Sequence, residues 1–351
     1  MTRTRGRRTL EGIPTLEVAG NRFFNIDCVA GARALLADDS IDLIVTDPPY
    51  GIAGDTLHQH YNRNEDFVVG GYVDVEPGQY QSFTRDWVAE AHRVLRPGGS
   101  IFIVSGYTRL YEVLHALRTT PLVEVNHLIW RYSFGVYTSR KFVSSHYHIL
   151  YYAKPGGRRT FNLESRFGRD EKAHHGGSAN YLDREDVWSL PREYKPRREK
   201  NKNELPTELL VKILQYASDP DDLVCDFFLG GFSTARVAIG LGRRATGFEV
   251  AVPTFQRRGA ALRSVTPDGL LATLHPPTIG VARNRSKRWD AAQLAALHDR
   301  YGSLREHQLT KSAAVARLGE EFGRGTFAIL RALKRIDAHA SARRPRTPKR
   351  R

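Results

Sequence analysis

Short apolar runs and segments of helical period alternate along residues 21–255 of the 351-residue chain. The apolar runs predict strands at 21–27, 41–47, 100–106, 125–132 and 146–154, with two more on either side of a glycine-rich loop within 222–250. Segments of helical period lie between them, at 28–39, 82–95, 107–118 and 206–218. This alternation predicts an α/β fold built on a doubly wound, mostly parallel sheet.

The pattern changes from residue 285 onward. Three short helical segments follow, at 288–303, 311–323 and 325–336, and they predict a compact, small all-α C-terminal module. The predicted domains are a basic N-terminal arm (1–19), the α/β domain (20–275), a linker (276–286), the trihelical module (287–338) and a basic tail (339–351).

The formal charge of +15 at pH 7 indicates a polyanionic partner, and nucleic acid fits better than a membrane surface. No apolar stretch approaches the roughly 18 residues of a spanning helix. The basic start MTRTRGRR lacks the apolar stretch of a secretory signal. Cys28 and Cys225 form no zinc or disulfide pattern, and His146 and His148 share a strand face without further ligands. We therefore expect a cytoplasmic protein with no metal.

The strand at 41–47 ends abruptly on Asp47, Pro48, Pro49 and Tyr50. Proline cannot donate to a strand ladder, so the two prolines lie just past the strand end. In an open α/β sheet, ligands bind at that end. The sequence therefore predicts a site with a carboxylate, a backbone carbonyl held by restricted residues, and an aromatic ring.

A second candidate site surrounds the glycine-rich loop. Asp226 ends a strand, Gly230 and Gly231 follow, a helix begins near Ser233, and Glu249 ends the next strand. Glycines allow the backbone to approach a ligand closely, and an acid at the next strand tip can accept both ribose hydroxyls. The spacing predicts a nucleoside cofactor, with an ordinary tight turn as the alternative. NAD and ATP are disfavoured because a third glycine and a Walker lysine are missing.

These stretches resemble the S-adenosylmethionine-dependent DNA amino-methyltransferases. DFFLGGFST (226–234) resembles their motif DPFxGSGTT, and TDPPY (46–50) resembles their catalytic motif. The catalytic motif comes first, which is the order of the β-type enzymes, and the resemblance covers roughly residues 20–255. It implies a Rossmann-like class I methyltransferase fold. The chain departs from the family at Leu205, Phe227 and Phe232, where lysine, proline and glycine are usual.

The resemblance implies S-adenosyl-L-methionine as the cofactor and assigns roles by position. The implied catalytic residues are Asp47, Pro48, Pro49 and Tyr50. The implied cofactor-binding residues are Asp27, Asp47, Pro206, Asp226, Phe228, Gly230, Gly231, Phe232, Ser233, Thr234 and Glu249. Among them, Glu249 would hold the ribose, Asp27 would lie near the adenine, and Pro206 belongs to a helix that closes the pocket.

The implied reaction explains the residue types at the strand end. An exocyclic amino nitrogen is a weak nucleophile because its lone pair is delocalised into the base. Asp47 can accept one amino hydrogen and the Pro48 carbonyl the other, which stabilises the positive charge that grows on nitrogen in the transition state. Tyr50 can stack on the base once it is flipped out of the duplex.

The target base and the activity leave several hypotheses open. Aspartate at the first position of the motif favours adenine N6, with cytosine N4 as the alternative. A catalytically silent DNA-binding protein that keeps the methyltransferase fold is an alternative of another class, and RNA methylation is a further one. The expected function is site-specific DNA methylation, as in restriction-modification systems.

Cations interleaved with aromatic residues indicate contact with DNA. The candidate DNA-binding residues are Arg131, Arg140, Lys141, Arg331, Lys334 and Arg335. The last three share a face of the third helix of the trihelical module, which loosely resembles a Myb/SANT helix-turn-helix. Residues 155–203 occupy the place of the target recognition region in β-type enzymes. Solvated faces and dimerisation are the alternatives, so DNA, a cognate restriction endonuclease and a second copy of the chain are the candidate partners.

Overall fold

The computed structural model describes residues 12–49, 75–132, 139–192, 204–277, 284 and 287–342. The chain divides into two compact units. The sheet unit comprises Met1–Arg166 and Glu185–His275, and the helical unit comprises Phe167–Arg184 and Pro276–Arg351. The predicted target recognition region, 155–203, is therefore shared between the two units.

One sheet forms the centre of the sheet unit. The described strands are β1 Thr15–Val18, β2 Asn21–Phe24, β3 Ile41–Thr46, β4 Leu95–Ser105, β5 Val123–Arg131, β6 His146–Ala153, β7 Val187–Ser189, β8 Leu223–Asp226 and β9 Arg244–Phe248. Their order in the sheet is β1-β2-β9-β8-β3-β4-β6-β5-β7. From β2 to β4 all neighbours are parallel, and β6 runs antiparallel to β4 and β5. The predicted doubly wound, mostly parallel sheet is confirmed.

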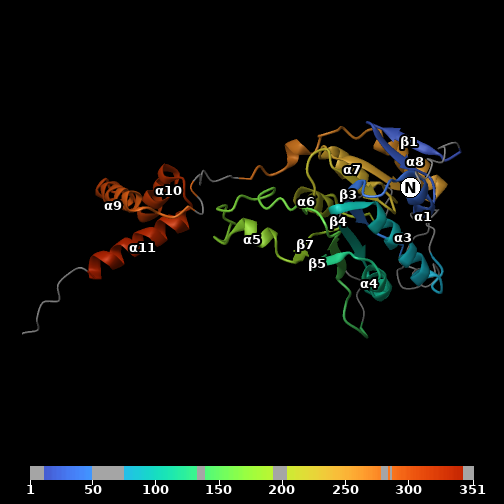
Figure 1. Ribbon diagram of the computed structural model, residues 1–351, viewed down its shortest axis with the longest axis horizontal. Coiled ribbons are helices and arrows are strands. Elements are labelled where there is room, and N and C mark those ends of the chain that lie inside the picture. The colour runs from blue at the N-terminus through green and yellow to red at the C-terminus, as the bar shows by residue number, and fades with distance from the viewer. Residues whose placement is uncertain are drawn as a thin grey trace, which may run out of the picture. The chain divides into compact units, whose positions relative to one another are not determined.

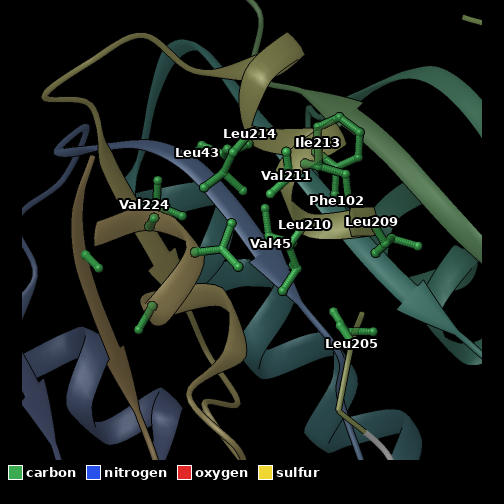
Figure 2. Close-up of a cluster of buried hydrophobic side chains, with 14 of the residues drawn as sticks. Leu43, Val45, Phe102, Leu205, Leu209, Leu210, Val211, Ile213, Leu214 and Val224 are labelled. Atoms are coloured by element: carbon green, nitrogen blue, oxygen red, sulfur yellow. The ribbon is translucent and has the colours of Figure 1, made fainter. Parts of the chain in front are cut away.

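Helices cover both faces of this sheet (Figure 1). On one face lie α1 Cys28–Leu35, α3 Tyr80–Val94 and α4 Leu110–Arg118. On the other face lie α6 Thr207–Ala217, α7 Ser233–Gly240 and α8 Val252–Leu262. Two short 3-10 turns, η2 Tyr107–Arg109 before α4 and η3 Leu271–Thr273 after α8, complete the described elements of this unit. Successive residues of β3 explain the division, because strand side chains alternate between faces. Ile44 packs with α1 and α3, whereas Leu43 and Val45 pack with the leucines of α6 (Figure 2).

β1 was not predicted, because its four residues fall in the expected N-terminal arm. Leu16 and Val18 enter the core while their neighbours stay exposed, and β1 pairs antiparallel with β2. Asn21 closes this hairpin: its Nδ2 donates to the Val18 carbonyl at 3.1 Å, and its Oδ1 accepts from Ala245 N at 2.6 Å. Residues 15–18 of the predicted arm therefore belong to the sheet, and a strand of four residues is too short to show a clear period in the sequence.

β4 also differs from the prediction, because it begins at Leu95 and not at residue 100, so the stretch RPGG (96–99) lies inside the strand. The pairing of β3 with β4 shifts between Ile41 and Leu43, and this bulge accommodates the left-handed Gly98, with φ of +79°. Gly98 N donates to the Lys154 carbonyl at 2.8 Å, so the backbone stays paired with the chain after β6.

β7 lies in a stretch for which the polar sequence predicted no strand. It pairs parallel with β5, and Trp188 at its centre is buried. Trp130 Nε1 of β5 donates to the Leu190 carbonyl at 2.8 Å, just beyond β7. One tryptophan among charged residues does not produce the alternating pattern that predicts a strand. β7 therefore could be recognised only from its pairing with β5.

The helical unit contains α5 Ala179–Asp183, α9 Ala291–Glu306, α10 Lys311–Phe322 and α11 Thr326–Ala342. The predicted all-α module is confirmed, and its third helix continues six residues past the expected end at 336. Its core contains Leu297, Leu304, Leu318, Ile329 and Leu333. In the described ranges, every helix is too short or too polar to cross a membrane.

Candidate active site

The two sequence motifs meet where the winding of the sheet reverses. β3 and β8 are neighbours, with Ile44 beside Cys225. From β3 the chain crosses to β4 on one side, and from β8 it crosses to β9 on the other. Such a reversal leaves a crevice outside the carboxyl ends of the two strands, where ligands bind in open α/β sheets. Asp47 and Asp226 are both at this edge.

Asp226 joins the two strand ends. Its Oδ1 accepts hydrogen bonds from Thr46 Oγ1 at 2.9 Å and from Phe228 N at 3.0 Å. The Thr234 side chain, at the start of α7, also bonds to this carboxylate. Burial raises the pKa of Asp226, and these three hydrogen bonds oppose the rise. Asp226 thus fastens β3, the glycine loop and α7 to one another.

Glu249 holds the other side of the loop. Its Oε2 accepts from Gly230 N at 2.8 Å, and its Oε1 accepts from Ala251 N at 2.7 Å. Asn25 Nδ2 donates to the Glu249 backbone carbonyl at 2.6 Å. Burial raises the pKa of Glu249, and the backbone N–H groups oppose that rise. Each carboxylate oxygen has a second lone pair with which it can accept a ligand hydroxyl.

Phe232 takes a backbone conformation that favours glycine. Its φ is +58°, which strains a residue that has a Cβ. The ring is 1% exposed and packs against Phe23 and Phe255, with ring centroids 5.6 and 5.9 Å away. Burial of these rings offsets the backbone strain. The turn is therefore kept although the usual glycine of the motif is absent.

Gly231 is required for a different reason. A Cβ at this position would lie 2.3 Å from Glu204 Oε1 and 2.6 Å from its Cδ. Glu204 itself lies 3.6 Å from Arg258 Nη1 of α8 and 4.0 Å from Arg236 Nη2 of α7. The glycine loop thus packs against a carboxylate that faces two arginines, and a side chain at 231 would displace it.

Tyr80 anchors the segment after β3. Its hydroxyl donates to the Pro49 carbonyl at 2.9 Å, its ring is 2% exposed, and the Arg109 guanidinium lies 5.0 Å above that ring. Asp47 is half-buried beside this segment. The catalytic role predicted for Tyr50 falls on a residue outside the described ranges.

The family model of the N6/N4 DNA methylases matches residues 41–252, which include both motifs. This chain belongs to that family. A curated relative, the type II methyltransferase M.BamHI of Bacillus amyloliquefaciens, is 28% identical over 246 residues, which are 65% of this chain and 54% of that protein. The chain thus spans about half the length of the methyltransferase that it matches.

Solved structures agree with the fold of this methylase family member. TTHA0409 of Thermus thermophilus, described as a DNA modification methylase, aligns with a TM-score of 0.51 and 22% identity over 69% of this chain and 94% of that one. The PvuII DNA methyltransferase, which is cytosine-N4-specific, aligns with a TM-score of 0.53 and 14% identity over 71% and 88%. At these identities the likeness shows the fold alone.

The structure brings most of the predicted site residues to one edge of the sheet. The ends of β3, β8 and β9 and the start of α7 carry Asp47, Pro48, Pro49, Asp226, Phe228, Gly230, Gly231, Phe232, Ser233, Thr234 and Glu249. Asp27 follows β2 and caps α1, where its Oδ1 accepts from Val29 N and Ala30 N at 3.1 and 2.9 Å. Pro206 directly precedes α6.

The predicted DNA-binding residues are more widely spread. Arg131 ends β5, separated from β3 by β4 and β6 in the sheet. Arg140 and Lys141 are exposed before β6. Arg331, Lys334 and Arg335 belong to the helical unit.

Three contributors to the site were missed from the sequence. Thr46 lies in the recognised motif but received no role, whereas Tyr80 and Glu204 lie outside both motifs. Only contacts between distant segments reveal them, because no local pattern marks a tyrosine at a helix start or a glutamate before a helix. Among the described residues, no three His, Cys, Asp or Glu side chains gather in a way that could hold a metal.

Proposed function

We propose that this chain transfers a methyl group from S-adenosyl-L-methionine to the exocyclic amino group of a flipped base in DNA. The observation that carries the proposal is the Thr46–Asp226 hydrogen bond, which joins the strand of the acid–proline motif to that of the glycine loop. A donor site and an acceptor site for one group must lie side by side, and this bond sets the two strand ends together.

The residues around the glycine loop fit the cofactor. Gly230 leaves open space where a Cβ would be, with only the Phe228 carbonyl within 4 Å, at 3.8 Å. Ser233 Oγ, at the first turn of α7, is buried and lacks a hydrogen-bond partner in the described structure, so it can bond to the methionine carboxylate near the helix N-terminus. The Glu249 carboxylate would accept the ribose hydroxyls. When bound, the cofactor supplies an activated methyl group on a sulfonium.

Asp47 and Pro48 would act on the base. The Asp47 carboxylate would accept one amino hydrogen and the Pro48 carbonyl the other, as the nitrogen gains its bond to the methyl carbon and becomes positive. The carbon–sulfur bond breaks in the same step and leaves a neutral thioether, and the nitrogen then releases one proton on the side of Asp47. Both acceptors bind the charged transition state more tightly than the neutral base, so they lower the barrier. Tyr80 supports this arrangement, because its bond to the Pro49 carbonyl restrains the peptide that follows.

We propose adenine N6 as the target on the basis of the aspartate at position 47. Cytosine N4 is the second candidate, since the PvuII enzyme with a matching fold is cytosine-N4-specific. The two bases present the same amino geometry to Asp47 and Pro48, so the contacts with the rest of the ring must decide between them.

Product analysis tests the proposal. The purified chain is incubated with S-adenosylmethionine and mixed-sequence duplex DNA, and the digested nucleosides are resolved by mass spectrometry. N6-methyladenine is the expected product. N4-methylcytosine would keep the mechanism and replace the base. No methylated nucleoside from this DNA, or from RNA in a parallel incubation, would overturn the proposal and favour a DNA-binding protein without catalysis.

A further inference from the structure

Three cations on α11 have no partner in the described part of the chain. Arg331, Lys334 and Arg335 are exposed, and spacings of three and four residues place them on one face of the helix. The structure shows no hydrogen bond or ion pair for any of them within the described ranges. The opposite face of α11 packs into the core of the unit through Ile329 and Leu333.

Other arginines of the helical unit are committed to contacts within it. Arg300 of α9 and Arg317 of α10 lie 3.0 and 3.7 Å from Glu321. Arg324 is 5% exposed, donates to the Lys287 carbonyl at 2.6 Å and lies 4.1 Å above the Trp289 ring. The α11 cations, in contrast, are exposed and unpaired in the described structure, and all three lie together on one face of a single helix. No acidic residue occurs between positions 321 and 337 of the sequence.

The backbone around α11 has the form of a helix-turn-helix. α10 ends at Phe322, residues 323–325 form the turn, and α11 begins at Thr326. Gly323 caps α10 in the left-handed conformation, with φ of +58°, and such a short, glycine-containing turn is typical of this motif. α9 packs against both helices and completes the three-helix core. In DNA-binding proteins of this form, the second helix of the motif enters the major groove.

We propose that the helical unit is a second DNA-binding site, in which α11 enters the major groove of duplex DNA. Arg331, Lys334 and Arg335 would contact phosphates or guanine edges. Leu330, which is 40% exposed next to them, suits the methyl group of thymine. An unpaired cationic face with an apolar residue complements this groove better than it complements a second copy of itself, because like charges repel. The choice of DNA as the polyanion rests on the proposed function.

Fluorescence anisotropy of the full chain with a labelled, mixed-sequence DNA duplex tests this proposal. The variant R331A/K334A/R335A should bind at least about tenfold more weakly than the wild type. The slope of log affinity against log salt, measured from about 50 to 200 mM, should fall by about 0.9 for each phosphate that the variant no longer neutralises. An RNA duplex of the same sequence should compete poorly, because its major groove is too narrow to admit a helix.

The variant R300A/R305A/R317A is the matched control, since it removes three charges from other parts of the same unit. It should keep its affinity to within about threefold, because charges farther than about 8–10 Å from the DNA are screened. Circular dichroism confirms that both variants are folded. Equal losses of affinity and slope in the two variants would overturn the proposal. It would also be wrong if the α11 variant dissociated a dimer in light scattering and still bound DNA normally. Because the readout is binding, a failure to methylate would leave this test intact.

Discussion

Thr46, at the end of β3, donates its hydroxyl hydrogen to Asp226, at the end of β8, over 2.9 Å and across 180 residues of sequence. The acceptor is a buried carboxylate that also receives Phe228 N and the Thr234 side chain. A single carboxylate therefore sets the distance between the acid–proline motif and the glycine loop. Substitutions at this hydrogen bond and at the neighbouring contacts should affect stability, the rate of methyl transfer and cofactor binding to different extents.

Replacing Thr46 with Val keeps the shape of the side chain and removes the donor. The buried Asp226 then lacks one partner, so the free energy of unfolding should fall by about 1–3 kcal/mol in urea titrations. Thr246→Val is the matched control, because the Thr246 hydroxyl donates to a neutral backbone carbonyl, that of Arg22, at 2.9 Å. Its loss should be smaller, and equal losses would argue against a special role for the carboxylate.

Tyr80→Phe should impair catalysis more than stability. The ring and its packing remain, but the Pro49 carbonyl loses the hydroxyl that restrains it. We expect the rate of methyl transfer to fall by about tenfold or more, because small displacements of catalytic groups are costly. Tyr152→Phe is the control: it also loses one hydroxyl contact, to Glu124 at 2.8 Å on β5, and should keep the wild-type rate. A Tyr80→Phe variant with the wild-type rate would show that the proline segment is held in another way.

Gly231→Ala should weaken the binding of S-adenosylmethionine, because the new methyl group meets the Glu204 carboxylate. Glu204→Ala in the same chain removes the obstacle. A double-mutant cycle measured by calorimetry should therefore give a Gly231→Ala penalty that is smaller by about 0.5–3 kcal/mol when Glu204 is absent. Additive effects of the two substitutions would mean that Glu204 does not constrain the loop.

His148 should make the fold sensitive to mild acid. Partial burial, together with His127 and His146 nearby, lowers the pKa of His148 from 6.5 to about 4. A base whose pKa is depressed in the folded state contributes stability above its unfolded pKa, and this stability is lost as the pH falls from about 6.5 toward 4.

Urea titrations at about pH 7.5 and pH 5 measure this loss. The decrease in unfolding free energy between the two values should be smaller in His148→Gln than in the wild type. His115→Gln, which changes an exposed histidine of α4, should behave like the wild type. Equal decreases in all three proteins would exclude His148 as the source of the pH dependence.

Much of the fold was predictable because the central strands are strongly apolar. Residues 41–47 carry a run of large aliphatic side chains that are now buried on both faces of the sheet. The exceptions were two short strands, β1 and β7. β1 buries only Leu16 and Val18, and β7 depends on Trp188, so neither contains enough apolar positions to define a period.

The candidate site was predictable as far as it follows strand ends. Asp47, Asp226 and Glu249 were predicted to lie at strand tips, and a parallel sheet necessarily brings such tips to one edge. The contacts of Tyr80 and Glu204 could not be predicted, because they depend on how α3 and α6 dock against the loops. Phe232 likewise needs the tertiary structure, since the rings of Phe23 and Phe255 come from distant segments.

The proposed mechanism requires that Asp47 acts on the amino group of the base while the glycine loop independently holds the cofactor. The Asp47→Ala variant separates the two roles when single-turnover methyl transfer and calorimetric S-adenosylmethionine binding are measured on the same preparation. We predict that transfer falls by about 10²–10³ or more, as when a preorganised group that stabilises the transition state is removed, while cofactor affinity stays within about tenfold of the wild type. Asp86→Ala, at a half-exposed position of α3, should leave both unchanged. Wild-type transfer by Asp47→Ala would contradict the mechanism.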